Sequence, residues 1–365
     1  MTQASDHTLR STTWMLRTCA LPTIALLLAA LPVSVFAADP PTTSWGAPDL
    51  QGTWDFRSIT PFERPKELAD KEFLTPEEAE AWEQRTLDAR AARRNQDPVQ
   101  GQGDVDVGYN AFWLDRGEKM TGTMRTSLVV DPPNGRIPPL TALAKLRSDE
   151  RYARWGGVPS GPEDRNPLER CIVGFNSGPP MNPGAYNNFA EIFQTPTYVA
   201  ILNEMINDHR IIPLDGRDHV PENMRFWKGD SRGRWEGNTL VVTTKNFTKH
   251  TNFRGSGPNM VLTERFTRTS QETLLYEYTI DDPESFEAPW SVAVEMKNSS
   301  DPLLEYACHE GNRAMTLMLS GARAREEKGQ SSDDWLASWY GGAKAAKAAK
   351  EAVESEGGAA PDDGN

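Results

Sequence analysis

The second half of the chain shows a hydrophobic pattern with a period of two residues. Apolar and polar residues alternate within Val261–Arg268, Thr273–Asp281 and Trp290–Lys297. In the second segment Leu274, Tyr276, Tyr278 and Ile280 share one face, and in the third Trp290, Val292, Val294 and Met296 do so. Such alternation predicts antiparallel strands with one face buried and the other in water.

A hairpin precedes these three segments. Gly237-Asn238 lies between Arg234-Trp235-Glu236 and the β-branched run Thr239–Phe247. Gly and Asn tolerate the positive φ that a tight two-residue turn needs, and β-branched residues favour strands. The sequence therefore predicts a meander that starts at this hairpin and continues through the three alternating segments.

Further strands are predicted earlier in the chain and near its end. They are Pro48–Phe56, Thr126–Val130 with a short return strand after the turn Pro133–Gly135, a hairpin of Ala190–Met205 and Arg210–Pro213 around Asn207-Asp208, and a last strand Leu303–Cys308. The pattern Gly52-x-Trp54 resembles the first strand of lipocalin-like barrels. Because nine or ten short strands occur without βαβ spacing, the fold class is mainly β: an antiparallel meander forming a lipocalin-like barrel or a strongly curved sheet. Such barrels can enclose one small ligand.

Helices are predicted at the periphery of this sheet. Thr75, Pro76 and Glu78 form the start of a helix that runs to about Arg94, with Thr75 as N-cap and Glu78 closing a capping box. A second helix is predicted over Thr141–Arg154. The Gly-, Pro- and Asn-rich segment Gly156–Asn187 is predicted to be a long loop, and loops of this length are usually functional or covering elements.

The two ends of the chain differ from the middle. Arg10 and Arg17 precede the apolar run Leu21–Phe36, and Val35-Phe36-Ala37 fits a cleavage site, so residues 1–37 are predicted to be a signal peptide. The run is too short to span a membrane comfortably. We therefore expect a periplasmic or secreted protein without membrane insertion after cleavage. Residues 38–330 are expected to form a single domain, followed by a helix (Asp333–Glu354) and a tail that is disordered by composition.

The net charge bears on possible partners, and the cysteines bear on a possible disulfide. The formal net charge of −13 disfavours nucleic acid as a partner. Two of the three cysteines, Cys171 and Cys308, follow the signal peptide. In an oxidising compartment we expect them to form a disulfide that ties the long loop to the last predicted strand, a link worth about 2–4 kcal/mol. The alternative is a pair of separate buried thiols.

Several common kinds of active site are not indicated. The histidines show neither H-x-H nor H-E-x-x-H spacing, so no metal site is expected. No glycine-rich phosphate loop is present, and no cofactor is expected. Ser231 lies in Gly-Asp-Ser-Arg-Gly without the strand-turn-helix context of a nucleophile elbow.

Two segments carry a resemblance to a known family. Gly229-Asp230-Ser231-Arg232-Gly233-Arg234-Trp235-Glu236-Gly237 and Tyr306-Ala307-Cys308-His309-Glu310-Gly311-Asn312 resemble the signature segments of an uncharacterised family of exported bacterial proteins. The likeness covers roughly residues 49–323. It supports export and implies no catalytic residues.

Two candidates for acid–base chemistry remain. A turn at Gly311 would place His309 at the barrel mouth, where an imidazole can transfer protons near neutral pH, and Glu310 follows it directly. The alternative is a histidine that merely flanks the disulfide. Glu264 shares a strand face with Leu262 and Phe266, so it is expected inside the barrel. A buried carboxylate has a raised pKa unless it is paired, and Arg232, Arg254 and Arg265 are candidate partners for a structural ion pair.

Candidate ligand-binding residues cluster around the hairpin. Asp230, Arg232 and His219 are polar groups that could orient a ligand at the barrel entrance, or simply satisfy one another. Trp235 and Tyr276 are candidates for the pocket wall, although such aromatics are more often core. The sequence thus favours an exported β-barrel protein that binds a small apolar or aromatic organic molecule. The alternatives are a cofactor-free acid–base enzyme (lyase, isomerase or hydrolase) and a carbohydrate-binding protein, and whether any reaction is catalysed stays open.

Overall fold

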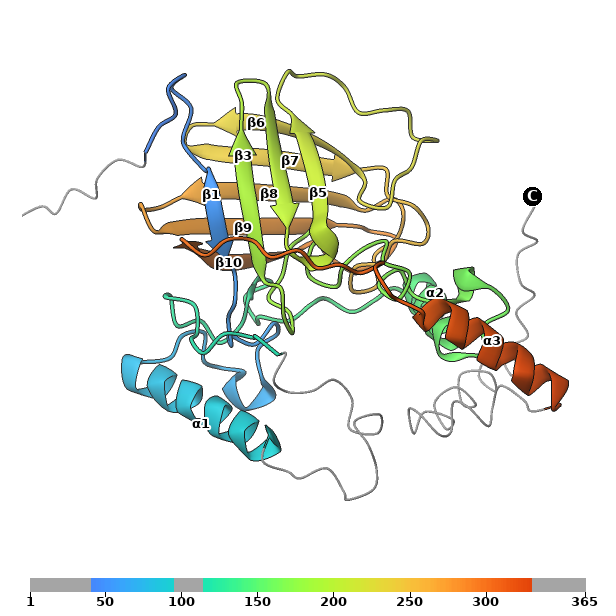
Figure 1. Cartoon of the computed structure of the whole chain (residues 1–365). Coiled ribbons are helices and arrows are strands. Elements are labelled where there is room, and N and C mark those ends of the chain that lie inside the picture. Colours follow the sequence, from blue (N-terminus) through green and yellow to red (C-terminus); the bar gives the residue numbers. More distant parts are fainter. Residues whose placement is uncertain (1–40, 95–113, 330–365) are drawn as a thin grey trace, which may run out of the picture. The chain divides into compact units, whose positions relative to one another are not determined.

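The computed structural model describes residues 41–94 and 114–329. These residues form a mainly antiparallel β structure with peripheral helices (Figure 1). The expected signal peptide (1–37), the C-terminal helix (333–354) and the tail lie outside the described residues. Within the described ranges, no helix is both long and apolar enough to cross a membrane.

Ten strands form one sheet. They are β1 (Gly52–Asp55), β2 (Val129–Asp131), β3 (Phe189–Gln194), β4 (Tyr198–Asn203), β5 (Asp208–Pro213), β6 (Asp230–Glu236), β7 (Thr239–Lys245), β8 (Val261–Arg268), β9 (Thr273–Asp281) and β10 (Trp290–Ser299). Their order is β5-β4-β3-β1-β10-β9-β8-β7-β6, with β2 also paired to β10, and every pairing is antiparallel. The meander predicted from the hairpin onwards is therefore confirmed as β6 to β10.

The sheet folds over on itself but is not closed by hydrogen bonds. In Figure 1 the strands β1, β3 and β5 cross steeply in front of β6–β10. The two edge strands, β5 and β6, come close without forming a ladder. At this seam a Cβ on Gly233 would lie 2.6 Å from the Leu214 side chain and 2.9 Å from the Ile212 side chain, so a larger residue here would force these side chains to shift. Side chains rather than a ladder join the edges, since the Lys228 ammonium binds the Asp208 carboxylate and the His209 carbonyl.

The core lies between the crossing strands. The apolar faces predicted for β9 and β10 are buried, with Leu274, Tyr276, Val292 and Val294 all 0 % exposed. Alternation of side chains along a strand sends these residues inward and their neighbours to the solvent. The largest fully buried side chains include Trp54, Trp290, Tyr276, Tyr278, Phe56, Phe247 and Phe266.

Three α-helices lie outside the sheet in the described part of the chain: α1 (Pro76–Arg94), α2 (Ala142–Gly156) and α3 (Ala314–Glu327). The capping box of α1 is confirmed, because the Glu78 amide donates to the Thr75 hydroxyl and the Thr75 amide donates to the Glu78 carboxylate. Thr141 caps α2 through its hydroxyl, which accepts from the Ala144 amide. A separate small core supports α1, formed by Ile59, Leu74, Ala79 and Met120 with Leu68, Trp82 and Met124 packed against them.

Several predicted strands differ from the structure. Leu303–Cys308 forms no strand, because β10 already has β9 on one side and β1 and β2 on the other. No return strand follows Pro133–Gly135. The segment 190–205 is two strands, since Thr195 makes a turn with Tyr198 around Pro196, which has no amide hydrogen for a ladder. Helix α3 was not predicted.

Candidate functional site

Glu264 lies inside the folded sheet, as predicted, and is 0 % exposed. Its partner is Arg210 on β5, which is not one of the three arginines suggested by the sequence. The two guanidinium nitrogens of Arg210 donate to the two carboxylate oxygens at 2.5 and 2.9 Å. Burial alone would lower the pKa of Arg210, but the charge of Glu264 and its hydrogen bonds raise it instead. The pair is a fork-to-fork contact of the strongest type.

Tyrosines extend this ion pair to the long loop. The Tyr276 hydroxyl donates to Glu264 at 2.8 Å and accepts from the Met181 amide at 3.1 Å. The Tyr278 hydroxyl donates to the Asn182 side chain at 2.6 Å. Burial raises the pKa of both tyrosines well above 10, so both hydroxyls keep their protons and donate. The loop segment around Met181, itself 1 % exposed, is thereby held in the core.

This loop occupies space that the sequence had assigned to a ligand. Met181 belongs to the same buried cluster as Tyr276, Phe266 and Val294. Tyr276, a candidate for the ligand wall, is fully buried and engaged on both sides of its hydroxyl. Trp235 is half-buried and packs on the outside of the same cluster. A ligand in the interior would therefore have to displace Met181.

The polar residues of the hairpin come together as expected. The Asp230 carboxylate lies 2.9 Å from Nδ1 of His219 and 2.6 Å from the Arg232 guanidinium, and it also accepts from the Val220 amide. Arg232 further donates to the Asp218 carbonyl at 3.0 Å. The His219 and Asp230 side chains are only 23 % and 11 % exposed. The contact orients the imidazole, and protonation at Nδ1 would leave Nε2 able to accept a proton.

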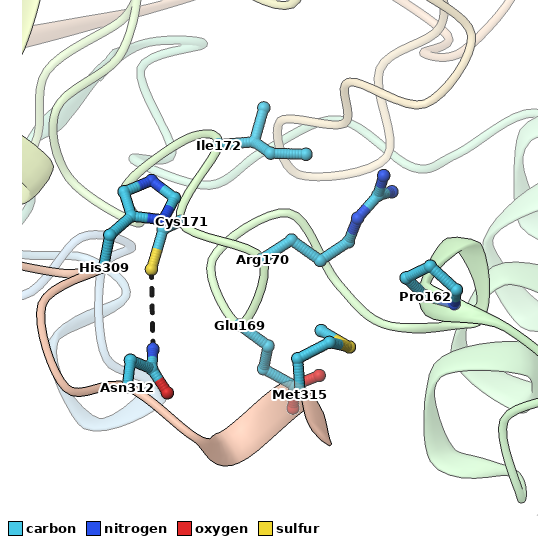
Figure 2. Close-up of a pocket in the computed structure, with 8 residues that line it drawn as sticks. All are labelled: Pro162, Glu169, Arg170, Cys171, Ile172, His309, Asn312 and Met315. Atoms are coloured by element: carbon cyan, nitrogen blue, oxygen red, sulfur yellow. Dashed lines mark hydrogen bonds between the residues drawn. The ribbon is translucent and has the colours of Figure 1, made fainter. Parts of the chain in front are cut away.

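A surface pocket of about 270 Å³, here called the disulfide pocket, lies where the long loop meets the C-terminal segment (Figure 2). Its lining combines apolar, cationic and polar groups: Pro162, Glu169, Arg170, Cys171, Ile172, His309, Asn312 and Met315. Glu169 is paired with Arg165, whose guanidinium donates to both carboxylate oxygens at 2.7 and 2.8 Å. Arg170 makes no ion pair among the described residues.

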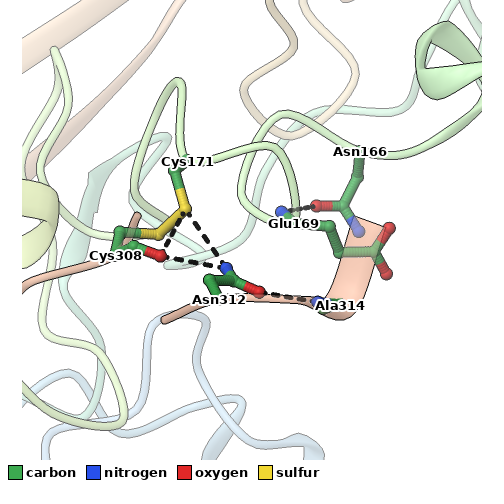
Figure 3. Close-up of a disulfide and its surroundings, with 6 residues drawn as sticks. All are labelled: Asn166, Glu169, Cys171, Cys308, Asn312 and Ala314. Atoms are coloured by element: carbon green, nitrogen blue, oxygen red, sulfur yellow. Dashed lines mark hydrogen bonds between the residues drawn. A yellow bond between two sulfur atoms is a disulfide. The ribbon is translucent and has the colours of Figure 1, made fainter. Parts of the chain in front are cut away.

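The two walls of this pocket are joined covalently. The predicted disulfide between Cys171 and Cys308 is present, with Cα atoms 5.8 Å apart (Figure 3). Asn312 reinforces the junction, because its amide donates to the Cys308 carbonyl at 2.9 Å and its carbonyl accepts from the Ala314 amide at the start of α3. At the far end of α3, Arg323 donates to the carbonyls of Ser160 and Pro159. Helix α3 is thus held to the loop at both ends.

The residues considered for acid–base chemistry are not brought together. Gly311 has φ +70° and turns the chain as expected, so His309 is exposed at the rim of the disulfide pocket and Glu310 is exposed beside it. Glu264 is buried in the core with both oxygens occupied. Catalytic roles for these three residues stay a prediction, and a shared site of His309 and Glu264 has no support in this geometry.

Sequence reasoning missed most of the pocket lining. Arg170, Ile172 and Asn312 were not singled out, although the expected disulfide already implied that the neighbours of Cys171 meet those of Cys308. Met315 belongs to the unpredicted helix α3 and gave no such signal. Across residues 41–94 and 114–329, no group of three or more His, Cys, Asp or Glu side chains is placed to hold a metal ion.

Comparisons with known proteins identify no family for this chain. No protein-family model matches it, and no curated protein matches it. Among solved structures, a mutant of the fluorescent protein UnaG is similar over 37 % of this chain and 86 % of that one, with 12 % identity and a TM-score of 0.21. The fold described above therefore rests on the strand pairing itself, which is that of a mainly antiparallel β protein.

Proposed function

We propose that this protein binds a small organic molecule in the disulfide pocket, and that it does so outside the cytoplasm, in the periplasm or as a secreted protein. The observation that carries the proposal is the lining of the pocket. Ile172, Met315 and Pro162 offer an apolar surface, and Arg170 and His309 add polar groups to the lining (Figure 2). This combination is typical of ligand sites, and a volume of about 270 Å³ is close to their usual lower size limit.

The disulfide supports the same proposal in two ways. It fixes the spacing of the two walls, so that less conformational entropy is lost when a ligand binds. It also forms stably only in an oxidising compartment, which agrees with the predicted signal peptide. Binding on the outside of the sheet leaves the Met181 segment in place, whereas binding in the interior requires its removal.

The experiment is a screen of small aromatic alcohols, acids and amines by saturation-transfer NMR on the purified protein. Hits are then measured against Met315→Trp, which fills the pocket, and against Leu317→Trp, a matched control on the same helix whose side chain is 65 % exposed and does not line the pocket. We expect Met315→Trp to weaken binding by about tenfold or more, a loss of about 1.4 kcal/mol. Hits that bind both variants like the parent, or a screen without hits, would contradict the proposal.

Acid–base catalysis is the second candidate, and the contact between His219 and Asp230 favours it. A carboxylate that orients an imidazole is the arrangement by which a general base is prepared. The test is a panel of nitrophenyl esters and glycosides with the parent, His219→Gln and His309→Ala. Turnover by the parent that falls by about 10²-fold or more in one variant would assign the base. Turnover that survives both substitutions would exclude these histidines.

A further inference from the structure

One side of α2 carries three positive charges, although the protein as a whole is acidic. Arg147, Arg151 and Arg154 follow one another at spacings of four and three residues, which places them on one side of the helix. Arg147 is anchored, because its guanidinium donates to the Gly255 carbonyl at 3.2 Å and to the Ser285 hydroxyl at 2.6 Å. The other two arginines have no such anchors among the described residues.

The C-terminal end of α2 meets the loop segment that carries Arg170, because the Arg165 guanidinium donates to the Trp155 carbonyl at 2.9 Å. The Arg151 guanidinium lies 5.9 Å from the ring centre of Trp155. Arg170, which lines the disulfide pocket, lies 5.9 Å from the ring centre of Trp227. On that same ring packs His250, with centroids 5.9 Å apart. The cations are thus arranged around flat apolar surfaces of the kind on which an aromatic ligand can stack.

Among the described residues, the cations of this cluster other than Arg147 form no ion pair, while the Arg147 guanidinium lies beside Gly257, whose amide donates to the buried Asp282 carboxylate. Those cations are Arg151, Arg154, Arg170 and Lys249. The nearby acids Asp149 and Glu169 are paired with Lys145 and Arg165, and Glu150 is exposed and forms no ion pair in these ranges. Two guanidinium nitrogens, Nη1 of Arg151 and Nε of Arg147, are buried without any hydrogen-bond partner. Buried donors that lack a partner are costly.

The cations also repel one another. Burial, followed by the charges of Arg147 and Arg154, lowers the pKa of Arg151. Burial, followed by the charges of Lys249, Arg154, Arg170 and Arg151, lowers the pKa of His250. An arrangement that is unfavourable for the protein alone becomes favourable once an anion occupies it, because each cation then gains an opposite charge and hydrogen bonds.

We propose that Arg151, Arg154, Arg170, Lys249 and His250 form an oxyanion site, here called the α2 cation site, which binds the carboxylate or phosphate group of an aromatic molecule. Arg170 borders both this site and the disulfide pocket. The inference rests on the proposed function only in placing the apolar body of that molecule in the pocket. Arginine suits the task because its fork of N–H groups matches the two oxygens of a carboxylate or phosphate.

The experiment compares benzoate, benzyl alcohol and inorganic phosphate by isothermal calorimetry on the full chain, at constant ionic strength balanced with chloride. Benzoate and benzyl alcohol share the ring and differ in the charged group. We expect benzoate to bind about tenfold or more tightly than benzyl alcohol, and the preference to disappear in Arg151→Gln. The double variant Arg154→Gln/Lys249→Gln should lose it too, and because both side chains are exposed its fold is not at risk.

The matched control is Lys66→Gln, which removes an exposed positive charge in another part of the chain and should keep the preference. The imidazole of His250, followed by NMR, should titrate at higher pH with benzoate bound than without it. If phosphate displaces benzoate, the site recognises the oxyanion group without needing the aromatic ring. If benzoate binds equally well in the presence of phosphate, the site is specific for carboxylates. Equal binding of benzoate and benzyl alcohol, a preference that survives the double variant, or no heat from either benzoate or phosphate overturns the inference.

Met315→Trp separates the two proposals. If it abolishes benzyl alcohol binding and the parent shows no preference for benzoate, the pocket is correct and the cation site is wrong. If benzoate still binds Met315→Trp and still depends on Lys249, the cation site is correct and the pocket is wrong.

Discussion

Replacing Glu264 by glutamine should destabilise the whole fold. The carboxylate is 0 % exposed, and its partner Arg210 is 8 % exposed. Glutamine keeps one acceptor for Arg210 but removes the charge and places an NH₂ group against a guanidinium N–H. The arginine charge is then buried without compensation, and removing one member of a buried pair costs about 3–5 kcal/mol. In a domain of this size that corresponds to a fall in Tm of about 6–20 °C.

The assay is thermal unfolding followed by circular dichroism, with Glu277→Gln as matched control. Glu277 is the same residue type on the neighbouring strand β9, where its side chain alternates with the buried tyrosines and lies outside the core. We expect its replacement to change stability by less than about 0.5 kcal/mol. Replacing both partners, as Arg210→Met with Glu264→Leu, should recover most of the loss or even stabilise by about 1–4 kcal/mol. The Tyr276 hydroxyl keeps one partner, the Met181 amide, in that variant.

Three results would refute this reasoning. A Glu264→Gln protein that melts with the parent would show that the pair contributes nothing, and a loss of turnover without a loss of stability would instead mark Glu264 as catalytic. A double replacement that is as unstable as the single one would show that the unpaired charge is not the cause.

Three further outcomes are expected. In denatured, unreduced full-length protein only Cys19 should react with a thiol reagent, and reaction of Cys171 or Cys308 would contradict the disulfide. Burial raises the pKa of Glu204 above its usual 4.5. The contribution of this residue to stability is therefore fully present below its pKa in the unfolded chain, and it is lost as pH rises through its pKa in the folded protein. Glu204→Gln should therefore become more stable relative to the parent as pH rises from 4 to 7. Chemical denaturation at both pH values measures this difference, and no gain between them would contradict the prediction. Thr75→Ala should cost about 0.5–2 kcal/mol through loss of the α1 cap, a change that urea unfolding measures and that an unaltered midpoint would disprove.

Local features of this protein could be predicted from the chain because they depend on neighbouring residues. Alternation alone placed Leu274, Tyr276 and Val292 in the core, since a strand sends successive side chains to opposite faces. The capping box at Thr75 needs only residues three apart. The pairing of Cys171 with Cys308 followed from their being the two cysteines after the expected signal peptide.

Features that join distant segments were decided by the tertiary structure. Glu264 binds Arg210, 54 residues earlier, because β5 crosses the strands of the meander, and no local pattern encodes that crossing. The segment Leu303–Cys308 has strand-like alternation but forms no strand, because β1 and β2 already occupy the side of β10 away from β9. The pocket joins the long loop to the C-terminal segment, and the Trp227 ring brings Arg170 of the long loop close to His250 of the segment after β7. Which cations meet, and whether an acid lies among them, depends on packing in three dimensions, because a charge interacts with whatever lies nearby regardless of its distance along the chain.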